Sequence, residues 1–181
     1  MPELIVKCPG DCSNIEIGAF VAFVRAGGEV SMQGLPERIR GSAALVFARV
    51  DGLVVGVAAL KRPQLSYRRR GSTESGAQLP AEEFPYELGW VYVSPESRGK
   101  GLSLSLSQAA LAESEGAGVF ATSRTDNIAM HRSLAKLGFG AVGNPFASGR
   151  GKHSLQVFVR YVAQPCGQPD LAHKAAQGRL P

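Results

Sequence analysis

A short glycine-containing segment, from Arg98 to Ser103, carries the residues whose chemistry is easiest to interpret. It follows a strand-like run and precedes a helix-like run, and Gly99 and Gly101 permit backbone conformations and close approach that side chains would block. The first amides of a helix have no partner within it and carry the positive end of its dipole. Arg98 and Lys100 add positive charge. The segment therefore predicts a site for phosphate groups.

This segment differs from the two most familiar phosphate-binding motifs. It lacks the G-x-x-x-x-G-K-[ST] pattern of the P-loop and the G-x-G-x-x-G pattern of dinucleotide folds. A glycine-rich turn can also do no more than link a strand to a helix, so the segment taken alone leaves both interpretations open.

The elements that must hold this segment follow two periodicities. Apolar and β-branched runs predict strands at residues 4–6, 45–50, 53–60, 86–93, 119–122 and 155–162. Helical spacing predicts helices that end near residues 25, 43, 115 and 137. Ser13 or Asp11 is expected to cap the first of these helices and Asp126 the last, and Asp51-Gly52 predicts a tight hairpin. Hairpin strands come first and α/β crossovers second, which predicts an α/β domain over residues 1–162, with a mixed sheet of six to seven strands and helices on both faces.

Two stretches are predicted to lack regular structure. Residues 61–85 combine basic residues, prolines and small polar residues, and we expect a long, mobile surface loop of a kind that often serves function. Residues 163–181 are polar and contain several prolines, and we expect a loosely ordered tail.

Composition narrows the class of protein. Hydrophobic residues make up 44% and charged residues 19%, which is typical of a soluble globular chain. No apolar run approaches the ~20 residues that cross a bilayer, and the first residues do not resemble a signal peptide, so we expect a cytoplasmic protein without a membrane partner. The net charge of +5 weakly favours acidic partners. Three cysteines and three scattered histidines fit neither a disulfide framework nor a zinc site, and no metal is expected.

Two motifs together resemble those of the GNAT superfamily of acyl-CoA N-acyltransferases. The loop of that family reads [QR]-x-x-G-x-[GA] after V-x-P, and this chain has Val93-Ser94-Pro95 followed by Arg98-Gly99-Lys100-Gly101-Leu102-Ser103. Only the last position differs from the family pattern, because this chain has Ser103 where the family has Gly or Ala. A second family pattern, N-x-x-A-x-x-x-Y-x-x-x-G-F, is matched in part by Asn127-Ile128-Ala129-Met130, Leu134 and Gly138-Phe139. The resemblance extends over about residues 86–146.

This resemblance implies a GNAT-like fold with acetyl-CoA as the acyl donor. It implies that the amides from Gly99 to Ser103 hold the pyrophosphate and that the backbone of Val91-Tyr92-Val93 pairs with the pantetheine arm like an added strand. Asn127 would form a hydrogen bond to that arm, and His131 would lie near it. Homodimers are common among proteins of this family.

Glu87 is the candidate general base for acetyl transfer to an amine. Strict alternation along residues 86–93 predicts two faces, one with Tyr86, Leu88, Trp90 and Tyr92 and the other with Glu87, Gly89, Val91 and Val93. A carboxylate among small and apolar neighbours is expected to have a raised pKa, which suits a base near neutrality. Several family members use a glutamate at a similar place. In the alternative interpretation, Glu87 meets only water or an arginine of the 61–85 segment.

The position that holds the usual tyrosine acid of the family is occupied here by Leu134, which cannot donate a proton. Either the thiolate leaves unassisted, or another group such as His131 or Ser133 serves, or the chain does not transfer acetyl to an amine. The leading hypothesis is an acetyl-CoA-dependent N-acetyltransferase that acts on a small-molecule or peptide amine. The run Arg68-Arg69-Arg70 leaves open a nucleic-acid- or tRNA-directed enzyme, and Leu134 leaves open a non-catalytic CoA-binding module.

Overall fold

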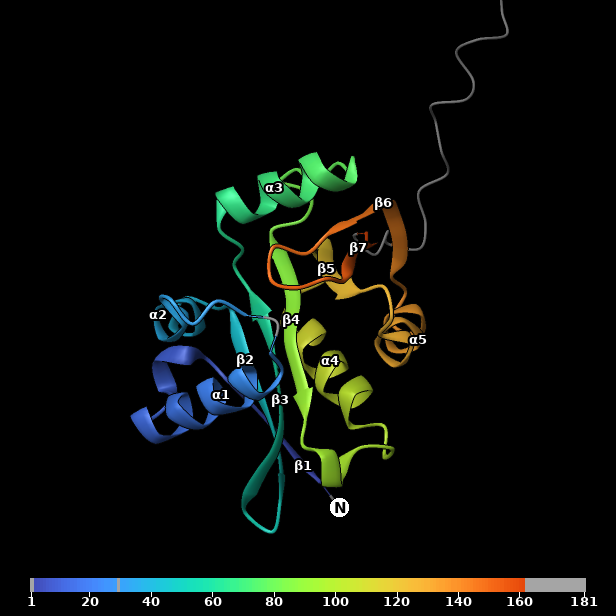
Figure 1. Ribbon diagram of the computed structural model, residues 1–181. Coiled ribbons are helices and arrows are strands. Elements are labelled where there is room, and N and C mark those ends of the chain that lie inside the picture. Colours follow the sequence, from blue (N-terminus) through green and yellow to red (C-terminus); the bar gives the residue numbers. More distant parts are fainter. Residues whose placement is uncertain (1, 29, 162–181) are drawn as a thin grey trace, which may run out of the picture.

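A mixed sheet of seven strands organises the computed structural model, which describes residues 2–28 and 30–161 (Figure 1). The strand order is β1-β2-β3-β4-β5-β7-β6, and every neighbouring pair is antiparallel except β4 and β5. The strands are β1 (Glu3–Lys7), β2 (Ala44–Val50), β3 (Leu53–Lys61), β4 (Tyr86–Val93), β5 (Val119–Arg124), β6 (Gly140–Ala147) and β7 (Ser154–Arg160).

Helices cover both faces of this sheet, as the sequence predicts. They are α1 (Asn14–Ala26), α2 (Leu35–Arg40), α3 (Leu65–Ser75), α4 (Leu102–Ala112) and α5 (Ile128–Lys136), with short 3-10 turns η1 (Pro9–Asp11) and η2 (Pro95–Ser97). On one face, α1 and α2 bury Phe20 and Ile39 against Phe47 of β2. On the other face, α4 buries Leu106 in a cluster that also holds Leu134 of α5. Removing these apolar side chains from water supplies the main stabilisation of the two layers.

Local signals at the start of the chain are confirmed. Ser13 is the N-cap of α1, where its side chain accepts a hydrogen bond from the Glu16 amide while the Glu16 side chain accepts one from the Ser13 amide. Asp51 and Gly52 have φ values of 50° and 79°, both left-handed, as a two-residue hairpin between twisted strands requires. At α5 the cap differs from the prediction by one residue, because Asn127 rather than Asp126 accepts from the Met130 amide.

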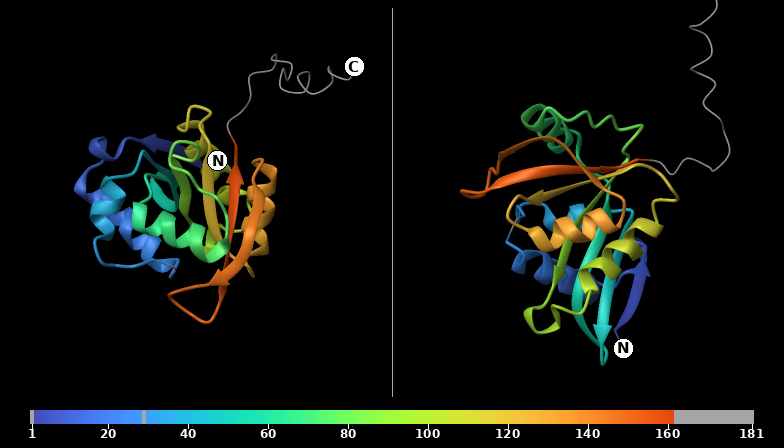
Figure 2. Two further views of the ribbon diagram at one scale, coloured as in Figure 1. Left: turned by 90° about the horizontal axis from the view of Figure 1, so that it is seen from above. Right: turned by 90° about the vertical axis from the view of Figure 1, so that its right-hand side faces the viewer.

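The prediction of a loop over residues 61–85 is wrong, because α3 occupies its middle (Figure 2). This helix has no apolar stripe, and its buried residues are Arg68 and Ser75. Arg68 donates to the carbonyl oxygens of Phe84 at 2.7 Å and Leu79 at 3.2 Å, and Ser75 donates to that of Gly71 at 2.6 Å. The Arg68 contacts reach beyond the helix, whereas the Ser75 bond lies within it. A polar tertiary contact therefore anchors a helix that hydrophobic periodicity cannot reveal.

The edge strand β6 was also missed. Its sequence contains Gly143 and Pro145, and its pairing with β7 shifts register between Val142 and Phe146. Proline is tolerated at such an edge because no ladder bond is lost there. A Cβ at Gly143 would lie 2.5 Å from the Ser75 carbonyl oxygen, so glycine allows α3 to pack on this strand. The tail predicted for residues 163–181 lies outside the described residues.

Candidate functional site

The loop between β4 and α4 presents open backbone amides. Gly99 and Gly101 have φ values of 78° and 75°, a region that favours glycine, and a Cβ at either one would meet nothing within 4 Å. At this end of α4 the first backbone bond within the described chain runs from the Ser105 amide to the Gly101 carbonyl at 3.1 Å, and none is found for the amides from Gly99 to Leu104. Gly101 is the N-cap and provides no side-chain cap. The loop is thus free to accept an anion at the positive end of the helix.

The two basic side chains of this loop differ in position. The Arg98 Nε donates to the Val93 carbonyl at 3.1 Å, and its guanidinium lies over the Tyr92 ring at 5.5 Å. Arg98 therefore braces the loop against the end of β4. Lys100 is exposed and lies outside the wall of the adjoining cleft, whereas Ser103 is half-buried and lines it.

The strand before the loop parts from its parallel neighbour. Strand β4 pairs with β5 only at Tyr86, Glu87 and Leu88. Farther along, Val91-Tyr92-Val93 lines a cleft instead, while its other edge continues to pair with β3. An unpaired strand edge of this kind can bind an extended ligand through main-chain hydrogen bonds.

A bulge in β4 interrupts the alternation of side chains predicted for residues 86–93, so that prediction is wrong beyond the bulge. Pairing with β3 shifts register beside Ala58, and Trp90 adopts a φ of 52°, unusual for a bulky residue. As a result, Leu88 and Val93 share the face packed by α4, although the spacing between them is odd. Val91 packs on that face as well, while Trp90 and Tyr92 pack on the α1 face. The extra residue in the bulge changes which side chains of the second half of β4 face α4, at the point where the strand separates from β5.

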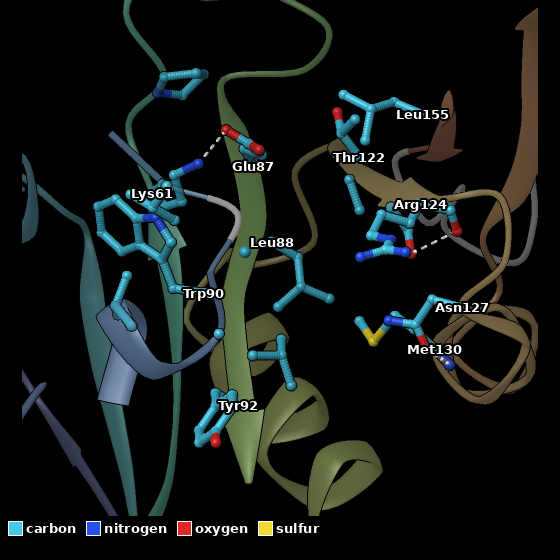
Figure 3. Close-up of a pocket in the computed structure, with 18 of the residues that line it drawn as sticks. Lys61, Glu87, Leu88, Trp90, Tyr92, Thr122, Arg124, Asn127, Met130 and Leu155 are labelled. Carbon is cyan, nitrogen blue, oxygen red and sulfur yellow. Dashed lines mark hydrogen bonds and ion pairs between the residues drawn. The ribbon is translucent and has the colours of Figure 1, made fainter. Parts of the chain in front are cut away.

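Glu87 is 3% exposed and lies at the upper end of the same cleft (Figure 3). Its neighbours are polar as well as apolar, unlike those predicted. Lys61, directly opposite on β3, places its ammonium 2.6 Å from one carboxylate oxygen, and the Tyr67 hydroxyl donates to the other at 3.1 Å. The Lys61 ammonium also lies 4.8 Å from the Trp90 ring centre. Tyr67 is 41% exposed as a residue, but desolvation of its hydroxyl, and then the charge of Glu87, raise the pKa of the phenol, so it stays a donor.

On the opposite wall, α5 supplies Asn127 and Met130 (Figure 3). The side-chain oxygen of Asn127, Oδ1, accepts the hydrogen bond that caps the helix, so the side-chain NH2 group remains to face the cleft. Leu134 is fully buried and also lines the cleft. His131 lies outside the cleft wall: its Nε2 is 2.9 Å from the Arg124 carbonyl oxygen, and its ring packs on Phe158 at 4.8 Å.

Together these elements enclose one cleft of about 1350 Å³ that extends from the α4 loop to α2 and α3. Its volume exceeds the range of about 300–1,000 Å³ typical of a site for one small ligand, so there is room for two reactants. Sequence reasoning missed Lys61, Tyr67 and Arg38 in its wall. The first two stand in the segment misinterpreted as a loop, and no local pattern marks any of them.

The basic run at 68–70 does not form a single surface patch. Arg68 is buried, Arg70 pairs with Glu74 at 2.9 Å, and Arg69 remains exposed. The helix α3 thus sends these charges in different directions, which weakens the interpretation of the run as a nucleic-acid contact.

Neither a metal-binding cluster nor a membrane-spanning helix is found in the described part of the chain. Across residues 2–28 and 30–161, no group of three or more His, Cys, Asp or Glu side chains could hold a metal ion. Within the same ranges, no helix has the length and apolar character needed to cross a bilayer.

Comparisons with known proteins agree with this geometry. A sequence model of the acetyltransferase (GNAT) family matches residues 19–139. No curated protein sequence matches the chain.

Solved structures share the fold at low sequence identity. The protein yncA of Salmonella typhimurium, solved with its cofactor acetyl-CoA, aligns with a TM-score of 0.65 and 15% identity over 93% of this chain and 99% of its own. An acyl-CoA N-acyltransferase from Pseudomonas aeruginosa gives 0.60 and 18% over 88% and 99%. N-acetylglutamate synthase from Neisseria gonorrhoeae, complexed with coenzyme A and N-acetyl-glutamate, gives 0.58 and 18% over 90% of this chain and 36% of its own.

Proposed function

The chain belongs to the acetyltransferase (GNAT) family, and from that premise we propose that it transfers the acetyl group of acetyl-CoA to the nitrogen of an amine. One observation carries the proposal: the open amides at the start of α4 stand beside the unpaired edge of β4. This arrangement offers sites for a diphosphate and for an extended amide-bearing arm, which coenzyme A combines in one molecule.

The residues present fit this donor. The amides from Gly99 to Ser103 would hold the pyrophosphate, and the open space at both glycines lets it approach the backbone. Val91-Tyr92-Val93 would pair with the pantetheine arm, and the Asn127 side-chain amide would donate to it from the other wall. Lys100 would add charge from the loop surface. His131 would act only indirectly, by fixing the start of α5 through the Arg124 carbonyl.

Glu87 would act as the general base. Its carboxylate would take the proton of the acceptor ammonium, which frees the nitrogen lone pair to attack the thioester carbonyl carbon. The C–N bond forms, the C–S bond breaks, and the sulfur of the coenzyme leaves as thiolate. The attacking nitrogen, which still carries one proton too many for an amide, releases that proton to water. Tyr67 and Lys61 would orient the carboxylate, since each contacts a different oxygen.

The bulge at Trp90 would supply the electrophilic assistance. Trp90 adopts a strained left-handed conformation in the middle of β4, where this strand separates from β5. The bulge there removes one residue from the regular ladder of hydrogen bonds with β3. An amide aimed into the cleft there can polarise the thioester carbonyl and stabilise the negative charge that develops on its oxygen.

The leaving thiolate would receive no proton from position 134. Leu134 has no acidic group and is fully buried. Tyr67 does not replace it, because its pKa is raised and its hydroxyl already donates to Glu87. We infer that the thiolate leaves unassisted and takes its proton from water.

Isothermal titration with coenzyme A and acetyl-CoA, followed by a free-thiol assay with a panel of amines, tests the proposal. We expect binding of both and thiol release that depends on an amine. Absence of binding would overturn the proposal. Binding without thiol release by any amine would favour a CoA-binding module instead.

A further inference from the structure

The end of the cleft remote from the α4 loop is walled by cationic side chains from three separate parts of the chain. Arg38 comes from α2, Arg68 from α3 and Arg150 from the connection between β6 and β7. Figure 1 shows α3 and the β6–β7 connection near the start of β4, with the α4 loop at its other end. The acidic side chains in the cleft wall are Glu37 and Glu87, and Glu87 is already paired with Lys61.

Arg68 is a buried cation without a contacting anion. Its residue is 7% exposed, and its guanidinium lies over the Phe120 ring at 5.2 Å. One terminal nitrogen donates to the carbonyl oxygens of Leu79 and Phe84, while Nε is buried and finds no partner. Among the described residues no carboxylate lies within ion-pair distance of it. Burying a guanidinium in this way is unfavourable unless an anion completes the site.

Arg38, which is half-buried, and Arg150, which is exposed, add two further cations to this part of the cleft wall. Arg38 donates to the carbonyl oxygens of Ser31, Gln33 and Gly34, and within the described ranges it pairs with no carboxylate. Burial lowers the pKa of Arg38 and the nearby charge of Arg150 lowers it further, while Glu87 acts in the opposite direction. Two like charges that approach each other beside a cleft are stabilised when an anion lies between them.

We propose that the acceptor is a small amine that also carries a carboxylate group. This proposal rests on the N-acetyltransferase function above. Arg38, Arg68 and Arg150 would bind the anionic group while Glu87 receives the amine. Guanidinium groups suit this role because their planar donors match the geometry of an oxygen acid. A polymer is disfavoured as acceptor because Arg68 is buried in the cleft wall rather than exposed on an open surface.

Matched acceptors test this directly. Free L-amino acids and the corresponding L-amino acid amides, which differ only in the anionic group, are compared by kcat/KM in the thiol-release assay. We expect the best acid to exceed its amide by about 100-fold or more, the effect of leaving buried charges unpaired. The α-amino group of an amino acid amide loses its proton more easily than that of the free amino acid. Intrinsic reactivity therefore favours the amide, which is opposite to the preference expected from the arginines. Equal turnover of acids and amides would overturn the proposal.

Arginine variants identify the subsite. Arg150→Gln and Arg38→Gln should each lower kcat/KM for the acid by about 10-fold while changing that for the amide little, so that the ratio falls. Arg69→Gln is the matched control, because Arg69 is exposed on α3 and lies outside the cleft wall. Arg150 is exposed, so its variant is not expected to disturb folding, whereas an Arg68 variant would. An acid-to-amide ratio unchanged in both Arg150→Gln and Arg38→Gln would contradict the assignment.

The outcomes separate this proposal from the function beneath it. If coenzyme A binds and neutral amines are acetylated with the same kcat/KM as acids, the proposal of an anionic subsite is wrong but the proposed function stands. If coenzyme A does not bind, the proposed function fails too. Acetyl transfer from radiolabelled acetyl-CoA to tRNA, with no amino acid turned over, would overturn the subsite in favour of a nucleic-acid acceptor.

Discussion

The two ends of the cleft are built from different parts of the polypeptide. The end proposed to bind the acyl donor, here called the donor end, is one continuous segment at residues 91–103 that offers mainly backbone groups. The end proposed to bind the acceptor, here called the acceptor end, gathers side chains from α2, β3, α3, the start of β4 and the β6–β7 connection. A backbone site needs only the correct local conformation, whereas a side-chain site needs particular residues brought together. Substitutions should therefore act through conformation at one end and through chemistry at the other.

The largest expected effect belongs to the acceptor end. Glu87→Gln keeps the shape of the side chain but removes the base, and we expect kcat to fall about 10³-fold. Affinity for coenzyme A should not change, because the donor end is untouched. The thiol-release assay and calorimetry measure the two quantities.

The matched control for this variant is Glu113→Gln. Glu113 is exposed at the end of α4, away from the cleft wall, and its variant should behave as the wild type. Wild-type kcat in Glu87→Gln would remove Glu87 from the mechanism.

The next effect belongs to the donor end. Gly99→Ala places a side chain on a residue with φ of 78°, which costs about 1–2 kcal/mol in that conformation. The loop will relax, and binding must then restore the conformation that presents its amides. We expect coenzyme A to bind about 10-fold more weakly, measured by calorimetry.

Gly52→Ala is the paired control, since Gly52 has φ of 79° and equally open surroundings in the β2–β3 hairpin. It should lower Tm as Gly99→Ala does and leave coenzyme A affinity unchanged. Equal coenzyme A affinity in both variants and the wild type would argue against a backbone-built donor end.

A smaller effect, on the free energy of unfolding, is expected at Glu16, which belongs to neither end of the cleft. Hydrogen bonds from Lys7 and the Ser13 amide lower the pKa of Glu16 to about 2, and Arg49 lies 3.1 Å from the same carboxylate. Because the folded pKa lies below the usual glutamate pKa of 4.5, this stabilisation is complete above pH 4.5 and is lost as pH falls toward 2. For a contact this near the surface we expect about 1 kcal/mol.

Glu16→Gln should therefore lower the free energy of unfolding at pH 7 and flatten its decline between pH 4.5 and 2, while kcat and coenzyme A affinity stay the same. Denaturant titrations across that range measure this. A pH profile identical to the wild type would show that Glu16 does not couple to folding.

The smallest effect should follow Lys100→Ala, although this residue stands within the donor loop. Its side chain is exposed and outside the cleft wall, so it contributes only a screened charge. We expect coenzyme A affinity to fall by about threefold or less, with a weaker dependence on salt. A loss as large as that of Gly99→Ala would mean that side chains hold the donor as firmly as the backbone does.

Several elements could be predicted because their signals are local. The Ser13 cap, the Asp51-Gly52 turn and the two glycines of the donor loop each depend on residues within a few positions of one another. The sheet with helices on both faces follows from the same local periods. The glycine turn of the loop proposed to hold the donor is also local, so its backbone conformation could be predicted in the same way.

What the sequence alone determined was therefore the order of the elements apart from α3 and β6, together with the glycine conformation of the loop before α4. Only the tertiary structure revealed α3, which Arg68 anchors to carbonyls 11 and 16 residues away, and the bulge that turns Trp90 away from Val91. It also brought Lys61, Tyr67 and Glu87 together across two strands and a helix. The reason is physical: backbone conformation is set mostly by near neighbours, whereas the convergence of side chains depends on how distant segments pair and pack.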